Sequence, residues 1–260
     1  MSGHAPRTTH HALIIGGTAA YGLDLAPYRP VDDPIALDTP YGPAPTITFL
    51  QPDSKRPPVA FCSRHGAGQL ARSAAFVNQR AIVWAAKMLG VNAIYSWNGV
   101  GAIASHLEVG DLIVPDDFLD FTRTRTTTFD NTDLIAAQEG SAFRPAFHPA
   151  ARAAILTAAS SLRNSETRRV YEAATYVCTE GPRLETASEI ALYHRAGADI
   201  VGMTLSPEVF LAQEVGIAYA SLCYVTNYAT GRAGERPPKR DFGVNVARVC
   251  LPLLLSASLH

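Results

Sequence analysis

The sequence of 260 residues contains little cysteine, and its formal net charge is only −1. The four cysteines, Cys62, Cys178, Cys223 and Cys250, are far apart and form no CxxC pair, so a zinc ribbon or a disulfide scaffold is not expected. Each lies in an apolar run, which indicates buried thiols in a reducing compartment. The balanced charge excludes a protein that binds nucleic acid or a membrane surface through charge alone.

Long hydrophobic runs are also missing. The closing stretch VCLPLLLSASLH is too short to span a bilayer and is interrupted by Pro252. Residues 1–11 contain no apolar core of a signal peptide, and we expect them to form a flexible N-terminus. We therefore expect a cytoplasmic protein with neither a membrane nor a nucleic-acid partner.

What the sequence does contain is an alternation of short apolar runs with stretches of helical periodicity. Residues 77–90, 148–162 and 184–197 carry apolar side chains at helical spacing. The runs rich in Ile, Val, Tyr and Thr predict strands, and they cover residues 12–15, 46–50, 59–62, 93–96, 112–115, 175–178, 199–203 and 219–226. The alternation predicts a single α/β domain over residues 1–260, with a central mixed, largely parallel β-sheet flanked by helices.

Two polar stretches interrupt this pattern. Residues 122–133, TRTRTTTFDNTD, are expected to form a loop or a hairpin. Residues 231–243, GRAGERPPKRDFG, are rich in glycine and proline and are a candidate mobile segment.

Common catalytic signatures are absent from the sequence: it has no GxGxxG, Walker A or GxSxG motif, and no Cys/His cluster with metal-ligand spacing. Instead, polar residues follow the predicted strands, where ligand sites of open α/β sheets gather. They are Thr18 in LIIGGTAAYG, Arg64 and His65 in FCSRHGAG, and Asn98 in YSWNGVGA. Each has an ordinary explanation: a strand-to-helix turn, a surface arginine beside a histidine, and a helix cap. Together they favour an anion site.

Three later loops carry groups suited to a polar heterocycle. Glu185 lies in TEGPRLETASEI, Met203 and Thr204 in DIVGMTLSPEV, and Asn227 in YVTNYATG. The ordinary explanations are a helix start for Glu185, core packing for Met203, a helix cap for Thr204 and a turn for Asn227. Taken together, the loops indicate an enzyme that acts on a small molecule with an anionic co-substrate.

The motifs GGTAAYG, SRHGAG, TEGPRLETASEI, DIVGMTLSPEVFLAQEVGIAYASL and VTNYA occur in an order that resembles the methylthioadenosine phosphorylase and trimeric purine nucleoside phosphorylase family. The resemblance covers about Ala12 to Leu255. It implies a homotrimer or a dimer of trimers, and phosphorolysis of a purine nucleoside. It also implies that no metal or organic cofactor is needed, because inorganic phosphate is a substrate.

The resemblance assigns roles to individual residues. It places phosphate on Thr18, Arg64, His65, Asn98 and Thr204, the ribose on Met203, the base on Leu184, Glu185, Asn227 and Ala229, and the 5′ substituent on Val246 and Cys250. Asn227, as donor to the leaving base, and Thr204, on the phosphate, are the expected catalytic residues.

The base preference follows from two of these positions. Adenine-specific members carry a TDYD pattern, whereas this chain has Asn227 and Ala229 in place of the two aspartates. A carboxamide can donate to a 6-oxo group, and Glu185 can accept the N1–H that 6-oxopurines have. The pattern is similar to that of S-methyl-5′-thioinosine phosphorylases. It predicts phosphorolysis of methylthioinosine, inosine or guanosine.

Other functions stay open at this point. They are a methylthioadenosine phosphorylase, a nucleoside hydrolase that uses water, a phosphorylase for a modified nucleoside, and a binding protein without turnover.

Overall fold

The computed structural model describes residues 11–67, 69–131, 133, 145–163, 169–232 and 244–259. Most of the expected flexible N-terminus, and nearly all of the candidate mobile segment at 231–243, lie outside the described residues.

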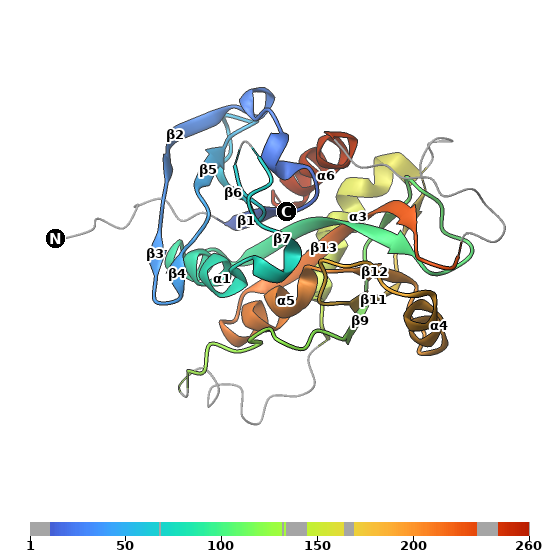
Figure 1. Ribbon diagram of the computed structural model, residues 1–260. Coiled ribbons are helices and arrows are strands. Elements are labelled where there is room, and N and C mark those ends of the chain that lie inside the picture. The colour runs from blue at the N-terminus through green and yellow to red at the C-terminus, as the bar shows by residue number, and fades with distance from the viewer. Residues whose placement is uncertain are drawn as a thin grey trace.

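The described chain forms one α/β domain, as predicted (Figure 1). The strands are β1 (Ala12–Gly16), β2 (Pro30–Ile35), β3 (Asp38–Thr39), β4 (Gly42–Pro43), β5 (Ile47–Leu50), β6 (Val59–Ser63), β7 (Ala93–Ala102), β8 (Leu112–Ile113), β9 (Asp117–Asp120), β10 (Val170–Tyr171), β11 (Thr175–Cys178), β12 (Ile200–Gly202) and β13 (Ala218–Tyr228). The helices are α1 (Gln79–Met88), α3 (Pro149–Arg163), α4 (Ala187–Arg195), α5 (Leu205–Glu214) and α6 (Val244–Ala257), with 3-10 turns η1 (Ala20–Gly22), η2 (Ala26–Tyr28) and η3 (Ala74–Phe76). Each predicted strand and helix is found, with ends shifted by a few residues.

The main sheet is mixed and largely parallel. Hydrogen-bonded neighbours follow the order β10-β8-β13-β7-β1-β6-β5-β2, while β12 joins the far end of β7 and β11 lies between β12 and β9. Strands β13, β7, β1 and β6 at its centre are mutually parallel. Their carboxyl ends therefore meet at one edge of the sheet, where ligand sites of such folds form.

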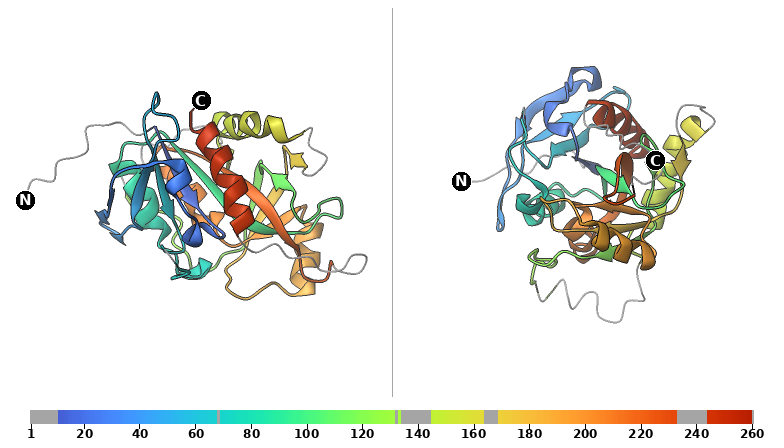
Figure 2. Two further views of the ribbon diagram at one scale, coloured as in Figure 1. Left: turned by 90° about the horizontal axis from the view of Figure 1, so that it is seen from above. Right: turned by 45° about the vertical axis from the view of Figure 1, so that its right-hand side comes forward.

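Two helical layers cover the sheet. Helices α3 and α6 pack on one face, and α1 and α5 on the other (Figure 2). Strands β1, β7 and β13 carry almost uninterrupted buried residues because both of their faces are covered. The four cysteines are buried and form no disulfide, in agreement with the sequence analysis. Burial raises the pKa of Cys62, Cys178 and Cys223 to about 12, which favours the protonated thiol over the nucleophilic thiolate.

Strand β13 contains an irregularity that matters for function. It pairs with β7 in regular register up to Val225 opposite Val100, and the next pair is Asn227 opposite Gly101. Thr226 is thus an extra residue, which makes a β-bulge. A bulge re-aims the side chains that follow it, and here it precedes Asn227.

Candidate active site

A cavity of about 230 Å³ opens at the carboxyl ends of β1, β6, β7, β12 and β13. It brings together nine of the twelve residues that the sequence analysis predicts. They are Thr18, His65, Asn98, Leu184, Glu185, Met203, Thr204, Asn227 and Ala229. Segments separated by up to about two hundred residues thus converge on one pocket, which supports treating it as a single site.

Two threonine hydroxyls in the cavity each accept a hydrogen bond from the protein and so keep a proton that they can donate to a ligand. The Thr18 Oγ1 atom accepts the backbone N–H of Gly99 at 2.9 Å, and the Thr204 Oγ1 atom accepts Nη1 of Arg64 at 3.3 Å. Each hydroxyl then keeps its own proton for another acceptor. Thr204 stands at the N-cap of α5, but its side chain makes no capping hydrogen bond. Both hydroxyls are therefore available to an anion.

Arg64 lies beneath the cavity and does not line it. Its guanidinium donates to both carboxylate oxygens of Glu208, at 2.9 and 2.7 Å, and both side chains are fully buried. Nη1 also donates to the carbonyl of Trp97 at 3.0 Å. A side chain at Gly17 would collide with this arrangement, since its Cβ would lie 2.8 Å from Nη1. Arg64 therefore acts on the site indirectly, through its hydrogen bond to the Thr204 hydroxyl.

A buried polar network extends from this ion pair. The hydroxyl of Tyr219 donates to Glu208 at 2.7 Å and contacts Ser96 Oγ at 2.8 Å. Ser96 Oγ also lies 2.9 Å from Ser221 Oγ. The Nδ2 group of Asn98 donates to Ser221 Oγ at 3.2 Å, so the network ends at a residue that lines the cavity. The network joins the supports of Thr204 and Asn98 in one connected unit.

Asn98 lies inside strand β7, so the helix-cap explanation does not apply. Its side chain is buried, and its Oδ1 atom has no hydrogen-bond partner among the described residues. Buried polar atoms without a partner are uncommon and costly. Asn98 is therefore a group whose hydrogen bonding a ligand can complete.

His65 is held in one tautomer. Its Nδ1 atom lies 3.0 Å from the carbonyl oxygen of Arg72. A carbonyl can only accept, so Nδ1 carries the proton and the Nε2 atom of the neutral ring is an acceptor. Burial, followed by the charge of Arg64, lowers the pKa of His65 to about 4. At neutral pH the ring can therefore accept a hydrogen bond from a protonated phosphate oxygen.

The opposite side of the cavity carries the groups predicted for the base. The Asn227 Nδ2 group donates to the carbonyl of Tyr228 at 3.0 Å, and its Oδ1 atom accepts the Thr226 hydroxyl at 2.9 Å. Because the Tyr228 carbonyl cannot donate, the nitrogen must stand on that side. One N–H of the amide remains for a ligand. Ala229 is buried and adds no polar group.

Glu185 faces the same space and is 7 % exposed. Its Oε1 atom accepts the Thr179 hydroxyl at 2.6 Å, and Oε2 has no hydrogen bond to the described residues. The helix-start explanation does not apply, because Thr186 caps α4 in a capping box with Glu189. The free oxygen of Glu185 is thus an acceptor for a ligand N–H.

The two apolar contributors differ in exposure. Met203 lines the cavity, and its sulfur occupies the space that a Cβ at Gly181 would need, 2.6 Å away. Leu184 lines the cavity too, but its side chain is 55 % exposed. Leu184 therefore covers the opening rather than the floor.

The structure does not bring Val246 and Cys250 to the cavity. Both lie on α6 with no exposed surface, packed in the core between this helix and the sheet. Their assignment to the 5′ substituent stays a prediction.

Arg125 is a residue of the site's support that the sequence analysis missed. It belongs to the polar stretch 122–133, which is a loop up to Asn131. Nη1 of Arg125 donates to the carbonyls of Met203 at 2.7 Å and Ser206 at 2.6 Å, and its Nε donates to Glu180 at 3.0 Å. The side chain fixes the backbone on both sides of Thr204. The sequence gives no reason to choose Arg125 over the neighbouring Arg123.

Within the described ranges, no group of three or more His, Cys, Asp or Glu side chains is placed to hold a metal ion. None of the described helices is both long and apolar enough to cross a membrane.

Comparison with known proteins now identifies the family. Residues 11–251 match the model of the Phosphorylase superfamily. The chain belongs to this superfamily.

Curated relatives of this phosphorylase superfamily member carry related names. A probable S-methyl-5′-thioinosine phosphorylase of Methanothermobacter thermautotrophicus is 40% identical over 216 residues, 83% of this chain and 71% of the relative. A 6-oxopurine nucleoside phosphorylase of Pyrococcus furiosus is 37% identical over 227 residues, 86% of this chain and 81% of the relative. Among solved structures, a methylthioadenosine phosphorylase of Schistosoma mansoni in complex with tubercidin superposes with a TM-score of 0.77. The two chains are 28% identical in sequence, and the match covers 96% of this chain and 90% of the Schistosoma mansoni chain.

Proposed function

We propose that this protein is a purine nucleoside phosphorylase that cleaves 6-oxopurine nucleosides: methylthioinosine, inosine or guanosine. The products are the free base and ribose 1-phosphate or its 5-methylthio analogue. The observation that carries the base preference is the fixed amide of Asn227, whose nitrogen is held towards the Tyr228 carbonyl beside the apolar Ala229. The chemistry requires no metal or organic cofactor, because phosphate is the co-substrate.

Phosphate would bind on the side of the cavity formed by Thr18, His65, Asn98 and Thr204. The two threonine hydroxyls donate to its oxygens, and Nε2 of His65 accepts from its protonated oxygen. Arg64 supports the anion through Thr204 and adds buried positive charge that Glu208 balances. Donors fixed before the ligand arrives do not have to reorganise during the reaction.

The reaction follows from this placement. The bond between the sugar C1′ and the purine N9 breaks with its electron pair going to the base, and the sugar gains oxocarbenium character. The phosphate oxygen then forms the new bond to C1′. Charge on the leaving base spreads to N7 and O6, where the free N–H of Asn227 can donate. Glu185 accepts the N1–H through its free oxygen. A donor aimed at developing charge contributes roughly 10²–10³ in rate.

A second candidate is a methylthioadenosine phosphorylase. A relative from Nitrosopumilus maritimus named S-methyl-5′-thioadenosine phosphorylase is 38% identical over 219 residues, 83% of this chain and 77% of the relative. Against it, the described cavity has no carboxylate at position 227 or 229 to accept from a 6-amino group.

The proposal includes a homotrimer acting in the cytoplasm in purine salvage. Leu184, which lines the cavity, is 55% exposed, and Leu192 on α4 is 48% exposed. Phe121, 39% exposed, packs its ring against Tyr193 of α4. Exposed apolar surface of this kind is typical of an interface. Sedimentation velocity of the purified chain tests the trimer.

The deciding experiment is base release from methylthioinosine, inosine, guanosine and methylthioadenosine, each with and without phosphate. We expect phosphate-dependent release of hypoxanthine or guanine and little release of adenine. Adenine release at an equal rate would disprove the base preference. Release without phosphate would instead identify a hydrolase, and binding without release would identify a protein that has lost catalysis.

A further inference from the structure

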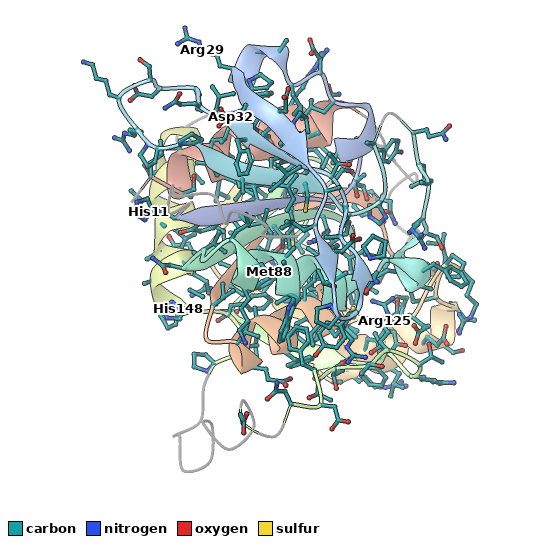
Figure 3. The ribbon with its side chains drawn as sticks, turned by 90° about the vertical axis from the view of Figure 1, so that its left-hand side faces the viewer. His11, Arg29, Asp32, Met88, Arg125 and His148 are labelled. Carbon is teal, nitrogen blue, oxygen red and sulfur yellow. The ribbon has the colours of Figure 1, made fainter. Side chains whose placement is uncertain are left out.

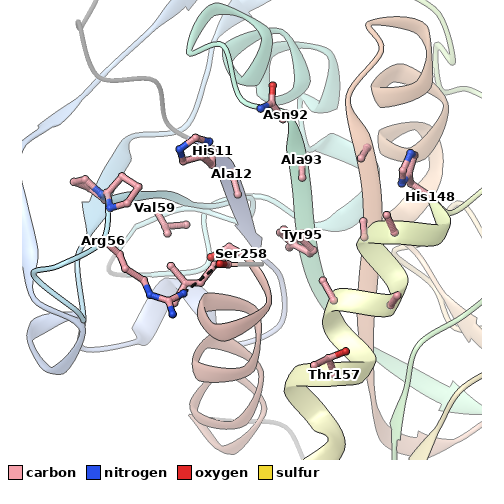
Figure 4. A pocket seen from close by; sticks show the side chains of 18 residues that line it. His11, Ala12, Arg56, Val59, Asn92, Ala93, Tyr95, His148, Thr157 and Ser258 are labelled. Atoms are coloured by element: carbon pink, nitrogen blue, oxygen red, sulfur yellow. Dashed lines mark hydrogen bonds between the residues drawn. The ribbon is translucent and has the colours of Figure 1, made fainter.

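A second and larger cavity, of about 880 Å³, lies at the opposite end of the sheet. Its floor is formed by the amino ends of β1, β6, β7 and β13, and its walls by α3 and the end of α6 (Figure 4). In Figure 3, His11 and His148 mark this end of the molecule, whereas Arg125 marks the end that holds the phosphorylase site. The two cavities share no lining residue.

The walls of this groove are made of small side chains. Four alanines of α3 line it, at positions 150, 151, 153 and 154, and three more come from the strands, at positions 12, 93 and 218. The small methyl groups of these alanines leave space between α3 and the strand ends and make this part of the lining apolar. The volume falls in the usual range of small-molecule sites, roughly 300–1,000 Å³.

Tyr95 is a second and independent feature. It lies on the floor of the groove, between Thr157 on one wall and Arg56 on the other (Figure 4). The residue is 5% exposed, and its hydroxyl makes no hydrogen bond to the described residues. Burial raises the pKa of this phenol, so it stays a proton donor at neutral pH. A buried tyrosine normally finds a partner for its hydroxyl, and because Tyr95 lines the groove its hydroxyl can donate to a molecule bound there.

The charges around the groove favour an anion. No acidic residue is among its described lining residues, which include Arg56, His11 and His148. Arg56 is held at the rim by a hydrogen bond from Nη1 to the Leu259 carbonyl at 3.2 Å and by a half-exposed ion pair with Asp53 at 3.6 Å. A half-exposed pair of this kind is weak, so the guanidinium can also bind a ligand.

We propose that this groove is a binding site for a small aromatic anion. The planar body lies between the alanines of α3 and the strand ends, a polar acceptor on it meets the Tyr95 hydroxyl, and the acidic group lies near Arg56. The inference does not depend on the phosphorylase reaction, because the lining residues of the two cavities are separate.

Isothermal titration with 8-anilinonaphthalene-1-sulfonate, an aromatic sulfonate, tests the proposal on the full chain. We expect one site per chain whose affinity is unchanged by saturating hypoxanthine and phosphate. Ala154→Leu should abolish this binding by filling the groove, and Tyr95→Phe should weaken it roughly tenfold by removing one hydrogen bond. Arg56→Gln should weaken it and reduce its dependence on salt.

Ser160→Leu is the matched control, since Ser160 is exposed on the same helix outside the groove. It should bind the probe like the wild type. Alanine and leucine are both good helix formers, and circular dichroism checks that each variant is folded. Unchanged binding in both Ala154→Leu and Tyr95→Phe would overturn the proposal, as would displacement by hypoxanthine. Absence of binding would also overturn it and leave water as the partner of Tyr95.

Discussion

Arg64 and Glu208 form a fully buried, two-pronged ion pair beneath the candidate active site, with N···O distances of 2.9 and 2.7 Å. The two residues are 144 positions apart in the chain. The guanidinium also supports the Thr204 hydroxyl, so one charged pair connects the core to the proposed phosphate site. Loss of either residue should affect both stability and catalysis, and these two effects can be measured separately.

We expect Arg64→Ala to lower the free energy of unfolding by roughly 3–5 kcal/mol, because it leaves the Glu208 carboxylate buried without its partner. Urea unfolding measures this loss. The double variant Arg64→Met, Glu208→Leu should be less destabilised than Arg64→Ala, since both charges are gone. Equal stability of Arg64→Ala and the wild type would contradict the structural role. Phosphate KM is then measured at a temperature where the variant is folded, and we expect it to rise severely.

Asn227→Asp tests the assignment of the base. A carboxylate cannot donate to O6 or N7 of a 6-oxopurine, but it can accept from a 6-amino group. We expect kcat/KM for inosine to fall by roughly 10²–10³ and the preference to shift towards adenosine. Steady-state kinetics with both nucleosides measure the shift. Unchanged inosine activity would remove Asn227 from base recognition.

Ala229→Asp is the companion variant, because it restores the second carboxylate of the adenine-specific pattern. On its own we expect it to impair 6-oxopurine activity. Together with Asn227→Asp it should raise adenosine activity further. A double variant that still prefers inosine would mean that the preference is set elsewhere in the cavity.

The fold and most of the site could be predicted from the sequence because their signals are local. Buried parallel strands give continuous apolar runs, and polar residues directly after such runs must lie at one edge of the sheet. This is why Thr18, after β1, and His65, after β6, converge as expected. Thr204 joins them because β12 pairs antiparallel with the far end of β7.

Other features depend on contacts between distant segments and left no local signal. The bulge at Thr226 arises from pairing with β7. Strand β7 extends to Ala102, whereas the apolar pattern ends near Ser96, so Asn98 looked like a loop residue. The burial of Arg64 depends on Glu208, which no spacing rule connects to it.

Arg125 is expected to act as a positioning residue. Arg125→Met removes the donors to the carbonyls of Met203 and Ser206 while keeping the aliphatic stem. The backbone around Thr204 would loosen, so we expect kcat to fall by about tenfold or more with a smaller change in the thermal midpoint. Arg125→Lys should recover only part of the activity, because the ammonium group of lysine cannot reproduce the several fixed donor directions of a planar guanidinium.

Arg123→Met is the matched control for this loop. Arg123 is exposed, and its side chain has no hydrogen bond or ion pair among the described residues. Its activity should equal that of the wild type. If Arg123→Met and Arg125→Met lose activity equally, the effect belongs to the loop as a whole and not to the Arg125 contacts.

His65 gives the protein a dependence on pH whose sign follows from its environment. Burial and the nearby Arg64 lower its pKa from 6.5 to about 4 in the folded state. Between these two values the unfolded chain binds more protons than the folded one, so stability falls as the pH falls from about 6.5 to 4. Above pH 6.5 the ring is neutral in both states and this contribution is constant.

Thermal unfolding of the wild type and of His65→Gln between pH 4 and 8 isolates this effect from that of the carboxylates. We expect the wild type to lose more stability than His65→Gln as the pH falls through this window, and the two curves to be parallel above it. Proton NMR of the His65 ring should show it neutral at pH 5.5. A ring that titrates near pH 6.5 would contradict both the lowered pKa and the proposed acceptor role of Nε2 towards phosphate.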